Sequence, residues 1–267
     1  MKPGKVVQAL SILMGLMFIA PIVLIFTTSL SKGTLITFPP DWLSFRWYRE
    51  ILSTDKWTDA FLNSAIVATL AALLSLVVGT LLAIAVSRGR SFIPNSLIIA
   101  LAVGPLIVPL IVSGVGFYIV AVRIGLTGTV LGLGLAHSSL GIPFVFLNVL
   151  AALSKLDPAI EEAARICGAG NLTTFLKVTL PLVLHSAFVG SVLAFILSWD
   201  EVVVGQFFNS PTFRTLPVVI YAEVRSGADP STSAIAVAAT VVSILIFAIT
   251  AVFGVLLRRR RLRSTLV

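Results

Sequence analysis

The residues best suited to chemistry lie in the polar segment 155–181, between two long apolar runs. Carboxylates and a guanidinium form charge-assisted hydrogen bonds with a partner, and small side chains between them let another protein approach closely. We therefore expect a helix over 158–168 that docks onto a cytosolic protein; the alternative is a solvated amphipathic connector without a partner. The residues concerned are Glu161, Glu162, Ala163, Ala164 and Arg165.

Local signals support this short helix. Asp157 can accept the unpaired N–H groups at a helix start, and Pro158 suits the first helical position. Gly168 can end the helix in a left-handed conformation. We expect a second helix to start near Thr173 and to run into the next apolar segment, with Pro181 near its beginning.

A second acidic pair follows that apolar segment. Asp200 and Glu201 come directly after Trp199. Acidic residues at a membrane are costly and often mark a pathway, so these three residues are candidates for the substrate pathway. The alternatives are an acidic pair at a helix end, or a salt bridge to Arg214 or Arg225.

The remaining ionisable groups give no sign of catalysis. His137 and His185 are expected to be structural, and Cys167 is the single cysteine. One cysteine permits no internal disulfide and no cysteine-based metal site. Neither a catalytic triad nor a metal cluster is recognisable, so we do not expect an enzyme.

The elements that must position these residues are membrane helices. The chain has 267 residues, of which 58% are hydrophobic and 11% are charged. A helix needs about 20 apolar residues to cross a bilayer. We expect an all-α membrane protein whose six transmembrane helices lie at about 8–29, 61–86, 96–122, 128–153, 178–204 and 233–257.

Two details qualify these spans. The first is expected to be an uncleaved anchor, because its apolar run is too long for a signal core and no cleavage site follows. The third contains Pro105 and Pro109, which predict either a packing kink or a bent helix that lines a pathway.

The charge distribution predicts the orientation. With the N-terminus inside, twelve of the nineteen Lys and Arg residues lie inside and eight of the eleven acidic residues lie outside. Both termini are then cytoplasmic. The basic run 258–263 is expected to lie against anionic lipid, and we expect no nucleic-acid partner.

The segment between the first two spans is rich in tryptophan. We expect it to be an extracytoplasmic loop at the membrane–water boundary with a short helix around 44–52. No repeat or linker is apparent, so residues 1–267 are expected to form a single transmembrane domain with its core at about 60–257.

The spacing of the polar segment resembles the EAA loop of ABC-importer permeases. Glu162-Ala163-Ala164 is followed after three residues by Gly168, then by Val178 and by Leu180-Pro181, with Val where the family usually has Ile. The stretch SWDEVVVGQFF, the later TFRTLPVVIYAEVRSGADPSTSAIA, Trp47-Tyr48 and Asn63-Ser64 are similar to the second permease subunit of spermidine/putrescine transporters.

This resemblance implies a type I ABC-importer transmembrane domain in a bacterial inner membrane. The helix at 158–168, with Gly168, Leu180 and Pro181, would couple the chain to a cytosolic ATPase dimer. A homologous second permease subunit and an extracytoplasmic substrate-binding protein are the other partners it implies. The chain has no G-x-x-x-x-G-K-[ST] phosphate loop, so we expect it to bind no cofactor, with ATP and Mg²⁺ used by the ATPase.

The resemblance favours a polyamine as the solute. Related permeases carry aminophosphonates, thiosulfate or ferric iron, and these alternatives stay open. An ion-coupled carrier is a different class, but it needs ionisable groups at mid-membrane and usually a repeated architecture, and the sequence has neither.

Overall fold

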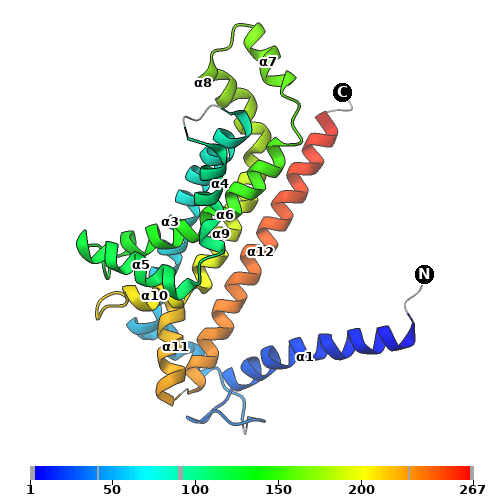
Figure 1. Ribbon diagram of the computed structural model, residues 1–267. Helices are drawn as coiled ribbons and strands as arrows, with labels where there is room; N and C mark the ends of the chain where they lie inside the picture. The colour runs from blue at the N-terminus through cyan, green and yellow to red at the C-terminus, as the bar shows by residue number, and fades with distance from the viewer. Residues whose placement is uncertain (1–3, 41, 90–92, 228, 265–267) are drawn as a thin grey trace. The chain divides into compact units, whose positions relative to one another are not determined.

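The computed structural model describes residues 4–40, 42–89, 93–227 and 229–264, and Figure 1 shows the order of its elements. Within these ranges the chain is almost entirely helical. The helices are α1 (Lys5–Ser29), α2 (Arg46–Ser53), α3 (Asp55–Arg88), α4 (Asn95–Val103), α5 (Leu110–Arg123), α6 (Val130–Leu153), α7 (Ala159–Ile166), α8 (Asn171–Thr174), α9 (Leu180–Asp200), α10 (Val203–Phe208), α11 (Leu216–Gly227) and α12 (Pro230–Ser264).

Five helical stretches in the described chain are long and apolar enough to cross a membrane, and a bent pair of helices makes a sixth. This confirms the all-α membrane fold class. The stretches are Val6–Ser29, Asp55–Arg88, Val130–Leu153, Asn171–Asp200 and Pro230–Ile249, with the pair Asn95–Leu106 and Leu110–Arg123.

The third predicted span, 96–122, is broken, as its two prolines predict. Its two halves are bent by 107°. A 3₁₀ turn at Gly104–Leu106 ends the first half, and Pro109, with φ −54° and ψ 133°, precedes the second. Proline lacks the N–H that an α-helix needs, and it disfavours helical backbone in the residue before it. Two prolines four residues apart therefore break the span.

The fifth predicted span, 178–204, also differs. The helix begins earlier, at Asn171, and passes through a π-helical turn at Phe175–Thr179. It ends at Asp200, because Glu201 has an extended backbone (ψ 118°) and a separate helix, α10, follows.

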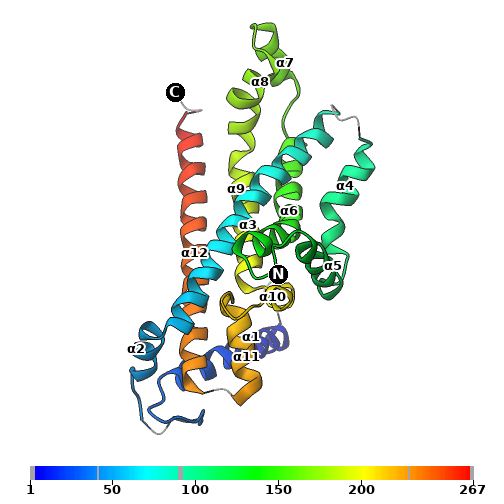
Figure 2. The same ribbon diagram turned by 90° about the vertical axis from the view of Figure 1, so that its left-hand side faces the viewer.

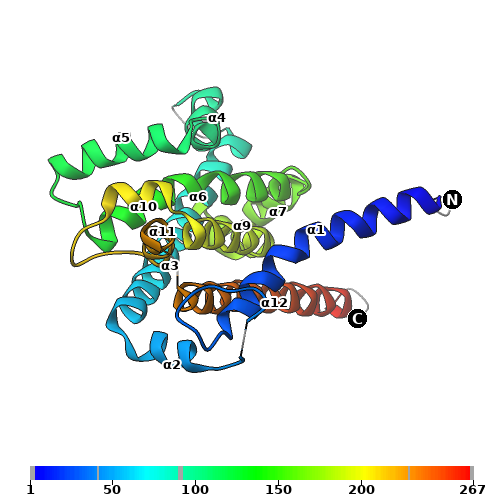
Figure 3. The ribbon, with the colours of Figure 1, turned by 90° about the horizontal axis from the view of Figure 1, so that it is seen from below.

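The chain forms two compact units, and the larger contains residues 60–218. Its centre is α6, which packs side by side with α9 (Figure 3). The approach is close, because a Cβ at Gly190 would lie 2.6 Å from Val145 Cα, and one at Gly79 of α3 would lie 2.8 Å from Val145 Cβ. Glycines on both neighbouring helices thus allow α6 to be buried.

The other unit contains residues 1–59 and 219–246. The apolar window of α1 is not buried at all, whereas Trp47 and Trp57 are each only 3% exposed. These two tryptophans are thus covered by the protein itself. The helix expected at 44–52 is α2, Arg46–Ser53.

Candidate functional site

The helix predicted at 158–168 is α7, whose ends are built as the sequence predicts. Asp157 Oδ1 accepts a hydrogen bond from Ala159 N at 2.9 Å. At the other end Gly168 has φ +88°, and its N–H bonds to Arg165 O while Ala169 N bonds to Ala164 O. These two bonds form a Schellman motif, which satisfies the last carbonyl groups of the helix. Figure 2 shows α7 beside α8 at one end of α6 and α9.

Glu161 is the one buried residue of α7, and its carboxylate contacts three other side chains. Arg88 at the end of α3 donates to Oε1 through Nε at 3.0 Å, and its Nη2 lies 2.9 Å away. Thr179 Oγ1 donates to the same oxygen at 2.8 Å. Arg165, one turn along α7, lies 3.5 Å from Oε2. The expectation that both carboxylates of this helix are available to a partner is thus wrong for Glu161.

These contacts keep Glu161 ionised. Burial acts to raise the pKa of its carboxyl, but the hydrogen bonds from Thr179 and Arg88 and the charges of Arg88 and Arg165 outweigh it. The pKa of Glu161 therefore lies below its ordinary value, and the network is charged at neutral pH.

The opposite face of α7 is open. Glu162 and Ala163 are exposed, Ile160 is 45% exposed and Ile166 is 87% exposed. The Glu-Ala-Ala motif thus presents one carboxylate, a small side chain and a flanking apolar rim to the outside.

The residues that follow the motif shape the start of the long helix. Leu180 and Pro181 begin α9 directly after the π-helical turn. Proline removes one backbone donor and crowds the preceding turn, and a π turn is a known way to absorb such a disturbance. Thr179, the last residue of that turn, is the one that reaches Glu161.

Glu201 is a helix cap in the described structure. It is 6% exposed, and its carboxylate accepts hydrogen bonds from the backbone N–H groups of Val203, Val204 and Gly205, at 2.8 to 3.1 Å. His137 Nε2 lies 3.2 Å from its Oε2. Carboxylates are stabilised at helix N-termini because the unpaired N–H groups and the helix dipole point at them.

The other two pathway candidates lie differently. Asp200 is exposed, and among the described residues it has neither an ion pair nor a hydrogen bond, so the salt bridges considered for it are absent there. Trp199 is 5% exposed and packs against Phe61 and Phe195 at centroid distances of 5.2 and 6.0 Å. The acids at 200 and 201 therefore differ in exposure and in hydrogen bonding.

His137 is structural, as expected: it is 1% exposed, and its Nδ1 lies 2.7 Å from Ser198 Oγ. His185 is half-buried, and its Nδ1 has no partner among the described residues. Arg88, Thr179 and Ser198 could not be predicted from the sequence, because each is distant in sequence from its partner. Arg88 and Thr179 lie 73 and 18 residues from Glu161, and Ser198 lies 61 residues from His137.

Two of the segments that resemble the spermidine/putrescine permeases, Asn63-Ser64 and the stretch that begins at Thr212, also contact each other. Asn63 Nδ2 donates to Arg214 O at 3.1 Å, and Ser64 Oγ accepts from Leu216 N at 2.8 Å. The opening of α3 is thus bonded to the segment that leads into α11.

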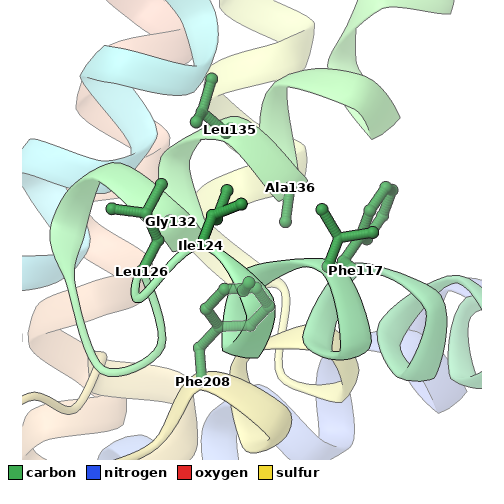
Figure 4. A pocket seen from close by; sticks show the side chains of 9 residues that line it. Phe117, Ile124, Leu126, Gly132, Leu135, Ala136 and Phe208 are labelled. Atoms are coloured by element: carbon green, nitrogen blue, oxygen red, sulfur yellow. The ribbon is translucent and has the colours of Figure 1, made fainter.

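A cavity of about 160 Å³ lies between α5, α6 and α10. Figure 4 shows Phe117 and Phe208 bordering it from α5 and α10, with Ala136 of α6 beside them. Its lining is apolar, so it offers nothing to fix the orientation of a charged or polar solute.

The fold and these elements define an inner-membrane permease. The family model of the binding-protein-dependent transport system inner membrane component matches residues 75–263. The chain belongs to this family, and it is a permease subunit of an ABC importer.

Two curated relatives and two solved structures give the closer comparison. The chain is 32% identical to the putrescine transport system permease protein PotI of Escherichia coli K12 over 84% of its length and 82% of the relative's. It is 29% identical to the spermidine/putrescine permease PotC of the same strain, over 84% of each.

Among solved structures, a bacterial ABC transporter involved in alginate import matches with a TM-score of 0.68 and 19% identity, over 92% of this chain and 94% of that one. The bacterial alginate ABC transporter in complex with its alginate-bound periplasmic protein also gives 0.68, at 15% identity, over 95% and 94%. At this identity the likeness shows the fold alone.

Proposed function

We propose that this chain forms half of the membrane pathway of an ATP-driven importer for putrescine, spermidine or a similar polyamine. The observation that carries the proposal is its similarity to two polyamine permeases over 84% of its length. The exposed Asp200 is compatible with a polycationic cargo, since a carboxylate near an entrance attracts cations.

We further propose that α7 seats in a cleft of a cytosolic ABC ATPase. Its open face offers Glu162 for a charge-assisted bond, Ala163 for close approach, and Ile160 and Ile166 for apolar contact. The coupling residues Gly168, Leu180 and Pro181 act by shaping the ends of α7 and α9 rather than by touching the ATPase. ATP and Mg²⁺ are used by the ATPase subunit.

The complete importer would contain an ATPase dimer, a second permease subunit and an extracytoplasmic binding protein. We assign both termini to the cytoplasm from the charge asymmetry. The contact between Arg88 and Glu161 supports this assignment in part, because it requires the C-terminal end of α3 and the helix α7 to lie on the same side of the membrane.

The cargo is tested by uptake in cells that carry or lack this chain, with the other subunits present. We expect radiolabelled putrescine to accumulate only with the chain, and unlabelled spermidine to compete. If thiosulfate, an aminophosphonate or ferric iron accumulates instead, the polyamine assignment is wrong while the importer class stands.

A further inference from the structure

Glu161 differs from every other residue of α7 in being buried. It is 7% exposed, whereas the adjacent Glu162 is open. A buried carboxylate is costly unless it is paired and hydrogen-bonded. The contacts of Glu161 offset this cost. Because we assign only the open face of α7 to a partner, docking does not explain why a carboxylate is buried on the other face.

The contacts of Glu161 join three separate elements. Arg88 belongs to the end of α3, Thr179 to the π turn before α9, and Glu161 itself to α7. All of the hydrogen bonds to Glu161 converge on Oε1, within 3.0 Å. A displacement of α7 along this direction therefore pulls on two helices that run through the membrane, α3 and α9.

The surroundings leave room for such a displacement. A cavity of about 100 Å³ adjoins the ion pair, and Arg88, Glu161, Thr174 and Thr179 line it. Thr174 is 3% exposed, and its Oγ1 has no hydrogen-bond partner among the described residues. The ion pair of Glu161 and Arg88 thus lies beside an unfilled cavity, and the Thr174 hydroxyl there has no partner among the described residues. The Glu161 carboxylate can therefore shift without meeting close-packed side chains.

We infer that Glu161 is a positioning residue that transmits movement of α7 to α3 through Arg88 and to α9 through Thr179. Glu162 contacts the ATPase, and Glu161 transmits the movement of α7 to the membrane helices. This inference rests on the proposed docking of α7. It assigns the two adjacent glutamates different tasks, which a measurement can separate.

The test uses the complete importer in proteoliposomes, with ATP hydrolysis and putrescine uptake measured together. Glu161→Gln keeps the shape of the side chain and one acceptor oxygen, but it removes the charge and replaces the second oxygen with an NH2 donor. We expect the assembled complex to hydrolyse ATP while importing about tenfold less solute per ATP, a change within the usual range of coupling between sites. A merely structural role would lower the abundance of complex and leave this ratio unchanged.

Arg88→Gln alone leaves the buried carboxylate with only Thr179 and the more distant Arg165, and it is prone to misfold. The double variant Glu161→Gln with Arg88→Gln avoids this, and we expect its ratio to equal that of Glu161→Gln, because the two residues act as one pair. A further large loss in the double variant, or a normal ratio in Glu161→Gln, overturns the inference.

Glu162→Gln is the matched control, with the same change at the next position. We expect it to weaken assembly with the ATPase but to keep the ratio in the complex that does form. If Glu162 variants assemble and transport normally, the docking proposal fails. If Glu162→Gln weakens assembly but Glu161→Gln imports a normal amount of solute per ATP, the docking proposal is retained and the transmission role of Glu161 is overturned.

Discussion

Adjacent acids in this chain have opposite surroundings at two places. Glu161 is held by Arg88 and Thr179 while Glu162 is open. Glu201 is buried under a helix N-terminus while Asp200 is exposed. Glu161 and Glu162 lie on one helix, where neighbouring residues point about 100° apart; Asp200 and Glu201 are separated by the end of α9. In each pair the buried acid is bonded within the chain and the exposed one is open to solvent.

Removing the cap of α10 should destabilise the protein. Glu201→Ala leaves three backbone N–H groups and His137 without their acceptor, at a cost on the order of 2 kcal/mol. Thermal unfolding in detergent should show a lower midpoint. Glu223→Ala is the control: it breaks an ion pair with Lys56 that is 29% and 41% exposed, and such pairs contribute less than about 1 kcal/mol. Equal losses for the two variants would contradict the capping role.

Neutralising the exposed acid should affect the cargo. Asp200→Asn is expected to lower putrescine uptake about threefold at low ionic strength, through weaker attraction of the cation. The deficit should shrink as salt is added, because screening removes long-range attraction.

Asp59→Asn, at another exposed acid, is the matched control and should leave uptake unchanged. Unchanged uptake in Asp200→Asn, over a range of putrescine concentrations, would remove Asp200 from the pathway.

At the scale of elements, local signals predicted α7 well. Asp157 and Gly168 act on backbone groups within a few residues, so their roles are readable from the sequence. The 107° bend between α4 and α5 was not predictable in size. Pro105 and Pro109 predict a break, but the angle depends on how α5 packs against α10, a contact distant in sequence.

The packing of α6 against α9 depends on Gly190. In Gly190→Ala the new Cβ would lie 2.6 Å from Val145 Cα, and backbone cannot yield cheaply. We expect a loss of about 1–3 kcal/mol in stability, as for other overpacked cores, seen as faster loss of folded protein in detergent. The matched control is Gly116→Ala in α5, where no atom lies within 4 Å of the new Cβ. A stability loss as large in the control would refute the packing argument.

At the scale of the whole molecule, the charge asymmetry predicts the orientation. In a Cys167→Ser background, a cysteine at Ser226 should react with an impermeant thiol reagent outside intact cells, and one at Ser154 should react only after permeabilisation. Both serines are exposed in the structure. The reverse labelling would place α7 outside and make an ATPase contact impossible.

The limits of the sequence are clearest at the two sites. The exposure of Glu162 was predictable, because the motif and its helix are local; its docking role stays a proposal. Glu161 was not distinguishable from it, since its partners Arg88 and Thr179 lie 73 and 18 residues away. The capping role of Glu201 was also not predictable, because it depends on the break between α9 and α10, which the sequence did not indicate.

The most direct test of the account is charge reversal at Glu162. In Glu162→Lys, we expect the permease to reach the membrane at normal abundance while co-purified ATPase and putrescine uptake both fall more than about tenfold, because a like charge now opposes the partner. Asp59→Lys, the same reversal at another exposed acid, should change neither. Normal uptake and normal ATPase recovery with Glu162→Lys would contradict the claim that α7 couples this permease to its ATPase.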